Sequence, residues 1–432
     1  EQKRPKVLPK AFEASLNCIV PNYFMTNYKK SLLAALLCAA SVSFTGCEKD
    51  NGPQKPIYVP EEISAAAVNL SENGTANCYI VKPGSVVSFT TSHKGNSETE
   101  LTGEGSTVKL VWQDSYGLVK TLYFDPEAQT AYAEIADSKG NALVAVCDVT
   151  GKILWSWHLW VCDYDPEATL YTTEANAAGT QWSFMDRNIG ATETTKGSFD
   201  NFGMLYQWGR KDPFPGAAGF TIQNEDYSYV ADGEKELYGI DGKVLFKIKD
   251  LADYHGTIEN SIQFPTTFYA MTYKATGEVD EYGEPEYVCD YITKDWVDVS
   301  DDDYWGGVSM KKTIYDPCPV GYKVPVSDAD GNTPYAWMKF TDMTWDAENH
   351  GALIYDQWFP CTGTRVYASG GLDYPEANPY AGVWFGTASV KPATSTSQVV
   401  YGQYMAIMKS KRTFKVNKDA RSQGMCVRCV KE

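Results

Sequence analysis

Short apolar stretches alternate with polar residues and turns between residues 66 and 165. Alternation with a period of two places successive side chains on opposite faces of a β-strand. The predicted strands are 77–81, 86–89, 108–112, 118–124, 131–135, 142–147 and 153–157. Turn residues separate them, as in Lys139-Gly140-Asn141. Many short strands at a spacing of roughly 8–12 residues predict a β-sandwich over 66–165.

Tryptophans crowd the last of these predicted strands, where Trp155, Trp157 and Trp160 surround His158. One interpretation is an aromatic surface on which sugar rings stack. The other is a strand whose rings close the core or the junction with the next domain. Trp155 and Trp157 share one face of a strand, and large aromatic side chains dominate protein cores. We therefore expect these rings in the core.

The pattern changes after residue 165. Gly, Trp, Tyr and Asp become frequent, periodicity is weak, and long loops are expected. The chain from residue 47 onward is too long for one small core, and length alone suggests roughly two to three domains. We therefore predict a second domain over 166–432.

A basic and then apolar pattern marks the first fifty residues. Met25 opens a segment that contains Lys29-Lys30, and an apolar run from Ser31 to Phe44 follows. The run is too short to span a bilayer, which needs roughly 20 apolar residues. A basic segment, a short apolar segment and small residues are typical of a secretory signal peptide. We predict a signal peptide over 25–46 and interpret 1–24 as an upstream extension that is not part of the fold.

Gly46-Cys47 at the end of this signal resembles a lipobox, the cleavage site of bacterial lipoproteins. The resemblance implies cleavage before Cys47 and acylation of its sulfur and amino group with fatty acids such as palmitate. An ordinary secretory signal with an incidental cysteine is the alternative. The charged residues at 48–50 resemble the surface-export signal of Bacteroides-type lipoproteins, and the prolines within 47–65 predict an extended tether. We therefore expect a lipid-anchored outer-membrane protein exposed at the cell surface.

The net charge argues against one class of partner. The whole sequence carries −17 at pH 7 and residues 1–46 carry +4, so the chain from Cys47 onward carries −21. Nucleic-acid binding needs Lys and Arg clustered along the phosphates, and the sequence has no such cluster. We therefore expect no nucleic-acid partner.

Four separated motifs follow one another in the region after residue 165. They are Met-Asp-Arg-Asn-Ile-Gly-Ala at 185–191, Leu-Tyr-Gln-Trp-Gly-Arg-Lys-Asp-Pro at 205–213, Asp-Pro-Cys-Pro-x-Gly-Tyr-x-Val-Pro at 316–325 with a following Trp337, and Val-Arg-Cys-Val-Lys at 427–431. Together they resemble the Fibrobacter succinogenes major paralogous domain, which is also found in fimbrillin-like surface lipoproteins of Bacteroides-type bacteria. The resemblance covers 182–432.

The resemblance implies a C-type-lectin-like (formylglycine-generating-enzyme-like) architecture, a mixed α+β core with long loops. It also implies a disulfide between Cys318 and Cys429, although the nearby Cys426 leaves open which of the two pairs. The fold class that results is mostly β with α+β: an N-terminal β-sandwich followed by a C-type-lectin-like domain over 166–432.

Metal chemistry finds little support. The four histidines are scattered, and none lies near another His or a Cys pair at zinc spacing. Cys426-x-x-Cys429 belongs to a stretch, 425–430, that looks like a strand, where residues three apart point to opposite faces. Asp301-Asp302-Asp303 is more typical of a solvated acidic loop than of a calcium site. We predict no metal and no cofactor.

Signatures of enzymes are also missing, because the sequence contains no Gly-x-Ser-x-Gly, no His-Glu-x-x-His and no P-loop. A glycosidase pair depends on the spatial separation of two carboxylates, which the sequence does not give. A formylglycine-generating-type enzyme with a reactive Cys426 or Cys429 remains a second alternative. The Val-Arg-Cys-Val motif resembles the non-enzymatic branch, so we predict a protein that is not an enzyme.

Aromatic residues on Gly-rich loops give a candidate recognition surface at 355–385. Such rings stack on sugars or fill a partner's pockets. Trp358 and Trp384 are expected in core strands. The candidate ligand-binding residues are Tyr367, Tyr374 and Tyr380, with Trp296 and Trp305 in a second loop.

These observations predict an adhesin or a fimbrial accessory or tip component that binds a protein or a glycan. A polysaccharide-binding lipoprotein of a glycan-uptake system is the alternative. The expected partners are the outer-membrane lipid, reached through Cys47, and pilus subunits or surface glycans.

Overall fold

The computed structural model describes most of the chain beyond residue 58. The described residues are 59–217 except 97 and 102, then 235–244, 247–250, 256–279 except 272, 283, 285–289, 294–335, 343–346, 348–349, 351–373, 380–388, 400–408 and 413–432. Two compact units divide the chain, 1–56 with 275–288 and 57–274 with 289–432. The described part of the first unit belongs to the two-stranded sheet of β16 (Tyr273–Val279) and β17 (Pro285–Cys289). The predicted signal peptide and Cys47 lie outside the described residues.

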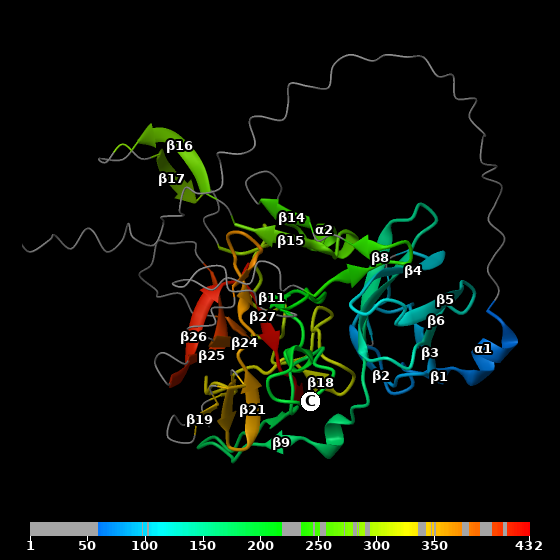
Figure 1. Ribbon diagram of the computed structural model, residues 1–432, viewed down its shortest axis with the longest axis horizontal. Helices are drawn as coiled ribbons and strands as arrows, with labels where there is room; N and C mark the ends of the chain where they lie inside the picture. The colour runs from blue at the N-terminus through cyan, green and yellow to red at the C-terminus, as the bar shows by residue number, and fades with distance from the viewer. Residues whose placement is uncertain are drawn as a thin grey trace, which may run out of the picture. The chain divides into compact units, whose positions relative to one another are not determined.

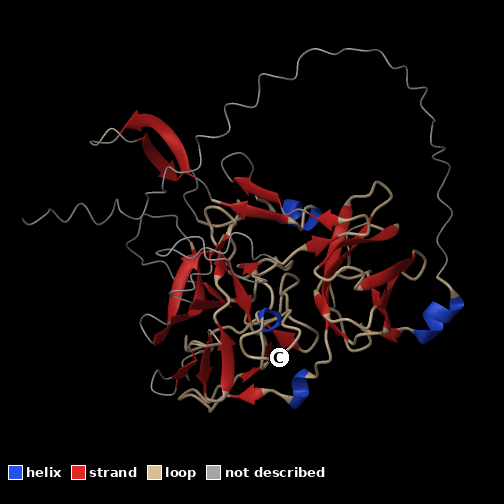
Figure 2. Cartoon of the chain, in the orientation of Figure 1, coloured by secondary structure: helices blue, strands red, loops and turns tan. Residues whose placement is uncertain are grey.

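Strands form 39% of the structure and helices 6%, which confirms the mostly β class (Figure 2). The α-helices of the described residues are α1 (Glu61–Ala66) and α2 (Ile258–Gln263). The side-chain oxygen of Thr257 accepts a hydrogen bond from the backbone N–H of Asn260, which caps the start of α2. Within the described ranges, no helix combines the length and the hydropathy that crossing a membrane requires.

The seven strands predicted from alternation are all present, as β2 to β8 (Figure 1). One sheet has the order β1–β3–β6–β5 and another the order β13–β12–β4–β7–β8–β2. The first contains β1 (Val68–Asn69), β3 (Val86–Thr90), β6 (Thr130–Ile135) and β5 (Val119–Asp125). The second contains β13 (Lys243–Val244), β12 (Leu237–Tyr238), β4 (Thr107–Gln113), β7 (Gly140–Cys147), β8 (Ile153–Val161) and β2 (Cys78–Val81).

Strand β7 is buried along its whole length, because the sheet around it is covered on both faces. Its Val144 and Val146 belong to a hydrophobic cluster that also contains Phe89 of β3. Its Leu143 faces the other way, into a second cluster that contains Trp208. A strand buried on both sides reads as a near-continuous apolar run, as Ala142 to Cys147 does.

Strand β8 divides its tryptophans between the same two clusters. Trp155 and Trp157 point to the cluster with Phe89, and Trp160 to the cluster with Trp208. All three β8 side chains are buried, with exposures of 0–1%. The expectation that these rings lie in the core is confirmed.

The chain beyond residue 165 contributes several further sheets. The largest has the order β23–β22–β27–β24–β25–β26, with β11 also paired to β27. Its strands are β23 (Leu372–Asp373), β22 (Thr364–Arg365), β27 (Gly424–Val427), β24 (Tyr380–Ala388), β25 (Tyr401–Met408), β26 (Thr413–Ala420) and β11 (Tyr206–Gln207). The smaller sheets contain β18 (Tyr322–Lys323), β28 (Val430–Lys431), β10 (Ser183–Phe184) and β9 (Tyr171–Thr172); β19 (Met343–Asp346), β20 (Gly351–Ile354) and β21 (Gln357–Pro360); and β14 (Lys247–Asp250) with β15 (Thr267–Ala270).

All four sequence motifs meet at β27 and β28, because Tyr322 of the motif at 316–325 pairs with Lys431 of β28. The backbone N–H of Met185 donates to Cys429, that of Ile189 donates to Val427, and Tyr206 of β11 pairs with Met425 of β27. The strand expected over 425–430 is split, because β27 ends at Val427 and β28 begins at Val430. The motifs are therefore neighbours in space although they are far apart in the sequence.

Residues on both sides of the predicted domain boundary at 165/166 share one core. Trp112 and Leu143 lie in the same hydrophobic cluster as Trp208, Trp296 and Trp384. Trp208 Nε1 donates to the carbonyl of Phe385 at 2.9 Å, which fixes one of these rings. The boundary itself stays a prediction, and the compact unit of 57–274 with 289–432 contains both segments.

Candidate ligand-binding cleft

Two tryptophans proposed as ligand-binding residues lie in the core. Trp296 and Trp305 are 0% and 1% exposed. Trp296 Nε1 donates to the carbonyl of Trp208 at 2.7 Å, and the ring of Trp208 lies 5.7 Å from that of Trp305. The prediction that these rings face a ligand is wrong, because packing against Trp208 takes up their surfaces. Trp358 and Trp384 are buried as expected.

The tyrosine candidates give a mixed result. The ring of Tyr367 is half-buried and packs against the core, and its backbone N–H donates to Gln423 at 2.7 Å. Tyr374 lies outside the described residues, and Tyr380 is described only as the first residue of β24. Of the three, only Tyr367 has a described side chain, so a shared surface of these tyrosines stays a prediction.

Cys318 and Cys429 form a disulfide, the pair that the family resemblance implies. Cys426 is a free thiol, buried in β27, and its Sγ lies 3.2 Å from Thr362 Oγ1. Burial raises the pKa of Cys426 to about 12. A buried, protonated thiol is a poor nucleophile.

The acidic side chains at 301–303 form an ion pair and hydrogen bonds within the protein. Asp302 forms an ion pair with the buried guanidinium of Arg421. Asp303 Oδ1 accepts hydrogen bonds from the backbone N–H groups of Val308 and Ser309 at 3.0 and 2.8 Å. Across the described ranges, no group of three or more His, Cys, Asp or Glu side chains is placed to hold a metal ion.

An open cleft of about 700 Å³ lies at one end of the six-stranded sheet. The turn after β4, the start of β7, the segment 192–200 and the residues around β12 form its walls. The charged side chains in these walls are Asp114, Glu193, Asp200, Glu236, Lys139 and Lys235. A cleft of this size matches the clefts in which proteins bind small ligands.

Asp114 forms the inner wall of the cleft. Its Oδ1 accepts the backbone N–H of Asn141 at 2.6 Å and its Oδ2 accepts Asn141 Nδ2 at 2.9 Å. A Cβ at Gly140 would lie 2.6 Å from the same Oδ1, so the glycine permits the close approach. Burial raises the pKa of Asp114, while the charge of Lys235 and the bonds from Asn141 oppose that rise.

Asn141 connects this carboxylate to a buried histidine. Its Nδ2 donates to Asp114 and to the carbonyl of Gly190, so its Oδ1 is the atom that faces His158 Nε2 at 2.9 Å. Because an amide oxygen only accepts, His158 carries its proton on Nε2. Its Nδ1 then accepts from Cys78 Sγ and from the hydroxyl of Tyr206, each at 3.5 Å.

Cys78, His158 and Asn141 thus stand in the order found in cysteine-nucleophile sites. Their environment argues against that chemistry. The three residues are 0–1% exposed. Burial lowers the pKa of His158 to about 3 and raises that of Cys78 well above its usual value. Both groups are neutral at pH 7, whereas a nucleophilic thiol needs its thiolate, so we assign the cluster a structural role.

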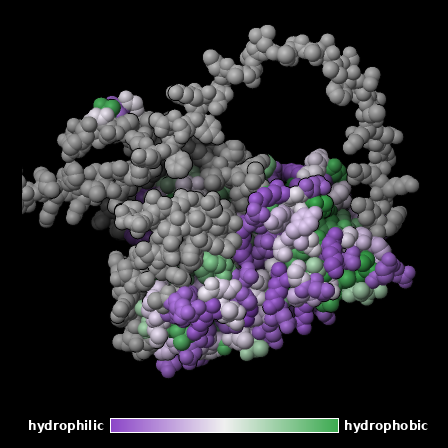
Figure 3. Space-filling model, viewed as in Figure 1, coloured by the Kyte–Doolittle hydropathy of each residue, from purple (hydrophilic) through white to green (hydrophobic). Residues whose placement is uncertain are grey.

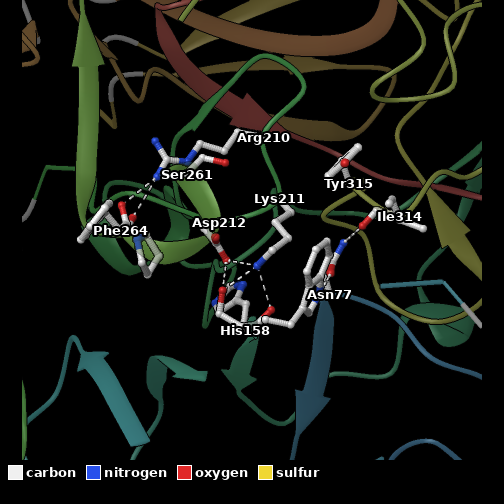
Figure 4. A network of polar contacts seen from close by, with 12 residues as sticks. Asn77, His158, Arg210, Lys211, Asp212, Ser261, Phe264, Ile314 and Tyr315 are labelled. Atoms are coloured by element: carbon white, nitrogen blue, oxygen red, sulfur yellow. Dashed lines mark hydrogen bonds and ion pairs between the residues drawn. The ribbon is translucent and has the colours of Figure 1, made fainter. Parts of the chain in front are cut away.

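A second buried polar group lies beside this cluster (Figure 4). Lys211 Nζ and Asp212 Oδ1 lie 2.7 Å apart, with both side chains 3% exposed. Ser156 of β8 donates to Asp212 at 2.8 Å and accepts from Lys211. The pair closes the segment after β11 onto β8, and Figure 4 shows Lys211 and Asp212 pointing toward one another.

The opposite wall of the cleft carries a second ion pair. Lys235 Nζ lies 2.7 Å from Asp200 Oδ1. Glu193 accepts hydrogen bonds from the hydroxyls of Ser198 and Thr195. The wall therefore combines charged groups and hydroxyl groups at the opening.

Aromatic side chains form the rim of the cleft. Tyr238 lies in the wall, and its hydroxyl donates to Glu236 Oε2 at 2.6 Å. Tyr116, 71% exposed, meets the ring of Tyr238 edge-on at a centroid distance of 5.7 Å. Phe199 contributes a further half-buried ring. The exposed ring of Tyr116 and the half-buried ring of Tyr238, beside fixed acceptors, offer both stacking and hydrogen bonding.

A smaller hollow of about 470 Å³ contains Trp182 and Asp328. Trp182 Nε1 donates to Val326 at 3.3 Å, and both oxygens of Asp328 accept from Asn332. These polar groups already have partners within the protein. Figure 3 shows one face of the molecule, on which hydrophobic residues are scattered in small groups among hydrophilic ones. We therefore take the larger cleft as the candidate site.

Sequence reasoning missed this site. Asp114 and Tyr116 lie in a turn between two predicted strands, where polar residues are ordinary. Glu236 and Tyr238 come from a distant part of the chain. The turn sequence Asp114-Ser115-Tyr116-Gly117, with an aromatic residue at an exposed turn position, is the one local signal that pointed here.

Comparisons of the chain with models of protein families, with curated proteins and with solved structures found no match.

Proposed function

We propose that this chain is an exported, lipid-anchored surface protein that binds a glycan in the cleft lined by Asp114 and Tyr238. The observation that carries the proposal is the pairing of aromatic rings with fixed polar groups around a cleft of about 700 Å³. Sugars present apolar faces to aromatic rings and hydroxyl groups to acceptors, so a site for them needs both.

The location outside the cytoplasm rests on the signal and lipobox pattern that ends at Cys47. The disulfide of Cys318 and Cys429 supports it, because such bonds persist in oxidising compartments. Mass spectrometry of the native protein tests this part. We expect an acylated product that starts at Cys47, and an uncleaved product without lipid would contradict the anchor.

We further propose that 66–165 form a β-sandwich and that 166–432 belong to the Fibrobacter succinogenes major paralogous family, with a C-type-lectin-like architecture. Two sheets that share a hydrophobic cluster support the first assignment. The meeting of the sequence motifs at β27 and β28 supports the second. Folding of 60–165 as a separate fragment would support the sandwich as a domain, and an unfolded fragment would argue for a single cooperative unit.

A glycan array with the purified full-length protein tests the proposed function. We expect retention on a defined set of saccharides, and loss of that retention in the variant Tyr238→Ala. The matched control is Tyr132→Ala, which removes a tyrosine from β6 and not from the cleft. Absence of binding to every saccharide would overturn the proposal, and equal loss in both variants would move the site away from the cleft.

A further inference from the structure

The charges of the cleft are unbalanced. Its walls contain four carboxylates and two lysines, a net charge of −2. Lys243, just outside the walls, pairs with Glu236, and counting it still leaves the cleft negative. Of the two wall lysines, Lys235 is already paired with Asp200. A negative cleft repels anionic ligands and attracts cationic ones.

The carboxylate of Asp114 is fixed in an orientation in which it can accept hydrogen bonds from a ligand. Asn141 gives one hydrogen bond to each carboxylate oxygen, which fixes the plane of the group. A carboxylate has about four lone-pair directions, so each oxygen retains one for a ligand. Asn141 is itself held by Gly190 and His158, and it is fully buried. The acceptor pair therefore needs little reorganisation on binding.

A protonated amine is the donor that such a site favours most. Hydrogen bonds between ionised partners are about twice as strong as those between neutral ones. The positive charge also offsets the cost of burying the Asp114 carboxylate beside the low-polarity core. A neutral hydroxyl can donate the hydrogen bond but carries no positive charge. A carboxylate or a sulfate neither donates a hydrogen bond nor carries a positive charge.

We propose that the cleft selects saccharides that carry a free amine over neutral and anionic ones, with Asp114 as the residue that receives the ammonium group. The inference rests on the proposed function and names its ligand class. Tyr116 and Tyr238 supply the surface for the sugar ring, and the acidic walls exclude uronic acids and sulfated sugars.

Titration calorimetry of the full-length protein tests the selection with three probes of matched length. They are a glucosamine oligomer with protonated amines, its N-acetylated counterpart, and a galacturonic acid oligomer. We expect the glucosamine oligomer to bind about tenfold more tightly than the N-acetylated one, as one charge-assisted bond predicts. The anionic oligomer is expected to show no binding.

The variant Asp114→Asn removes the charge and nearly keeps the shape. We expect it to abolish the preference for the amine while binding to the N-acetylated oligomer persists. The control is Glu127→Gln, which makes the same charge change at an exposed position beyond the far end of β5 and should keep the preference. Loss of the preference in both variants would mean that net charge alone causes it.

The outcomes separate the two proposals. Equal or tighter binding of the N-acetylated or anionic oligomer would overturn the selection for amines and leave glycan binding standing. Failure of all three probes, together with a blank glycan array, would overturn the proposed function itself. Circular dichroism of each variant checks that a loss of binding does not come from unfolding.

Discussion

The buried polar cluster and the open cleft meet at Asn141, which bonds to His158 on one side and to Asp114 on the other. On the buried side, His158 and Cys78 are neutral and every bond runs to another protein group. On the cleft side, Asp114 keeps acceptor capacity that faces solvent. The difference is access to solvent. A buried polar group keeps the hydrogen-bond partners that the protein gives it, whereas a polar group at an opening can also bond to a ligand.

The comparison also explains why geometry alone is a poor guide to chemistry in this chain. Cys78, His158 and Asn141 stand at hydrogen-bonding distances, yet burial stabilises the uncharged forms. Asp114 belongs to no such arrangement, yet burial raises its pKa and it lines a cleft with an aromatic rim. The arrangement of Cys78, His158 and Asn141, although it resembles a known catalytic site, has a structural role. The cleft at Asp114 is the candidate site.

The largest effect is expected from breaking the buried ion pair. Asp212→Ala leaves the Lys211 ammonium without its counter-charge in the core, and we expect a loss of about 3–5 kcal/mol in the free energy of unfolding. Urea titration followed by tryptophan fluorescence measures it. Asp200→Ala, which breaks the solvent-exposed pair with Lys235, should cost less than about 1 kcal/mol. Equal costs would erase the distinction between the two regions.

A smaller loss in the free energy of unfolding is expected at Asn141, where the buried polar cluster and the cleft meet. Asn141→Ala removes the partners of His158 Nε2, of the Gly190 carbonyl and of one Asp114 oxygen, at a cost of about 2–4 kcal/mol. The same change should weaken glycan binding, because the carboxylate loses its fixed plane. Asn332→Ala, a half-buried asparagine that also donates to an aspartate, is the control and should leave binding unchanged.

The strands could be read from the sequence, and the cleft could not. Alternation located strands such as β6, whose buried residues recur with a period of two, and a continuous apolar run located β7. The core role of Trp155 and Trp157 followed from the same pattern. The cleft requires Tyr116 and Tyr238, 122 positions apart, to meet. That contact depends on β12 pairing with β4, and a two-residue strand leaves no periodic signal.

Trp296 and Trp305, which the sequence analysis predicted at a binding surface, show a second limit of prediction from the sequence. Trp296 and Trp305 lie in segments without regular periodicity, and sequence reasoning placed them on a surface loop for that reason. Their indole N–H groups instead donate to backbone carbonyls in the core. A loop with little secondary structure can still be buried when its aromatic side chains fill a core, which local pattern does not reveal.

The pH dependence of stability separates the buried histidine His158 from the buried acids of the protein. His158 has a pKa of about 3 in the folded protein and an ordinary value near 6.5 when unfolded. Between these values only the unfolded chain binds the proton, so the free energy of unfolding should fall by about 1.4 kcal/mol per pH unit as the pH drops below 6.5.

Asp295 and Asp316, each with a pKa raised to about 6 by burial, act in the opposite direction over an overlapping range. The folded protein holds their protons where the unfolded chain has lost them, so they add stability as the pH falls from 6 toward 4. The measurement is therefore the difference between wild type and His158→Gln. A difference that does not change between pH 7 and pH 4 would show that His158 is charged in the folded state.

The smallest effect on stability, and the one most specific to the cleft, is expected at its rim. Tyr116→Ala removes a ring that is 71% exposed, so the free energy of unfolding should change by less than about 0.5 kcal/mol. Glycan affinity should fall about fivefold, because an aromatic contact contributes about 1 kcal/mol. Tyr116→Phe, which keeps the ring, should retain the affinity. If Tyr116→Ala bound glycans with unchanged affinity, the aromatic rim would have no role in binding. The binding surface would then consist of the cleft walls alone.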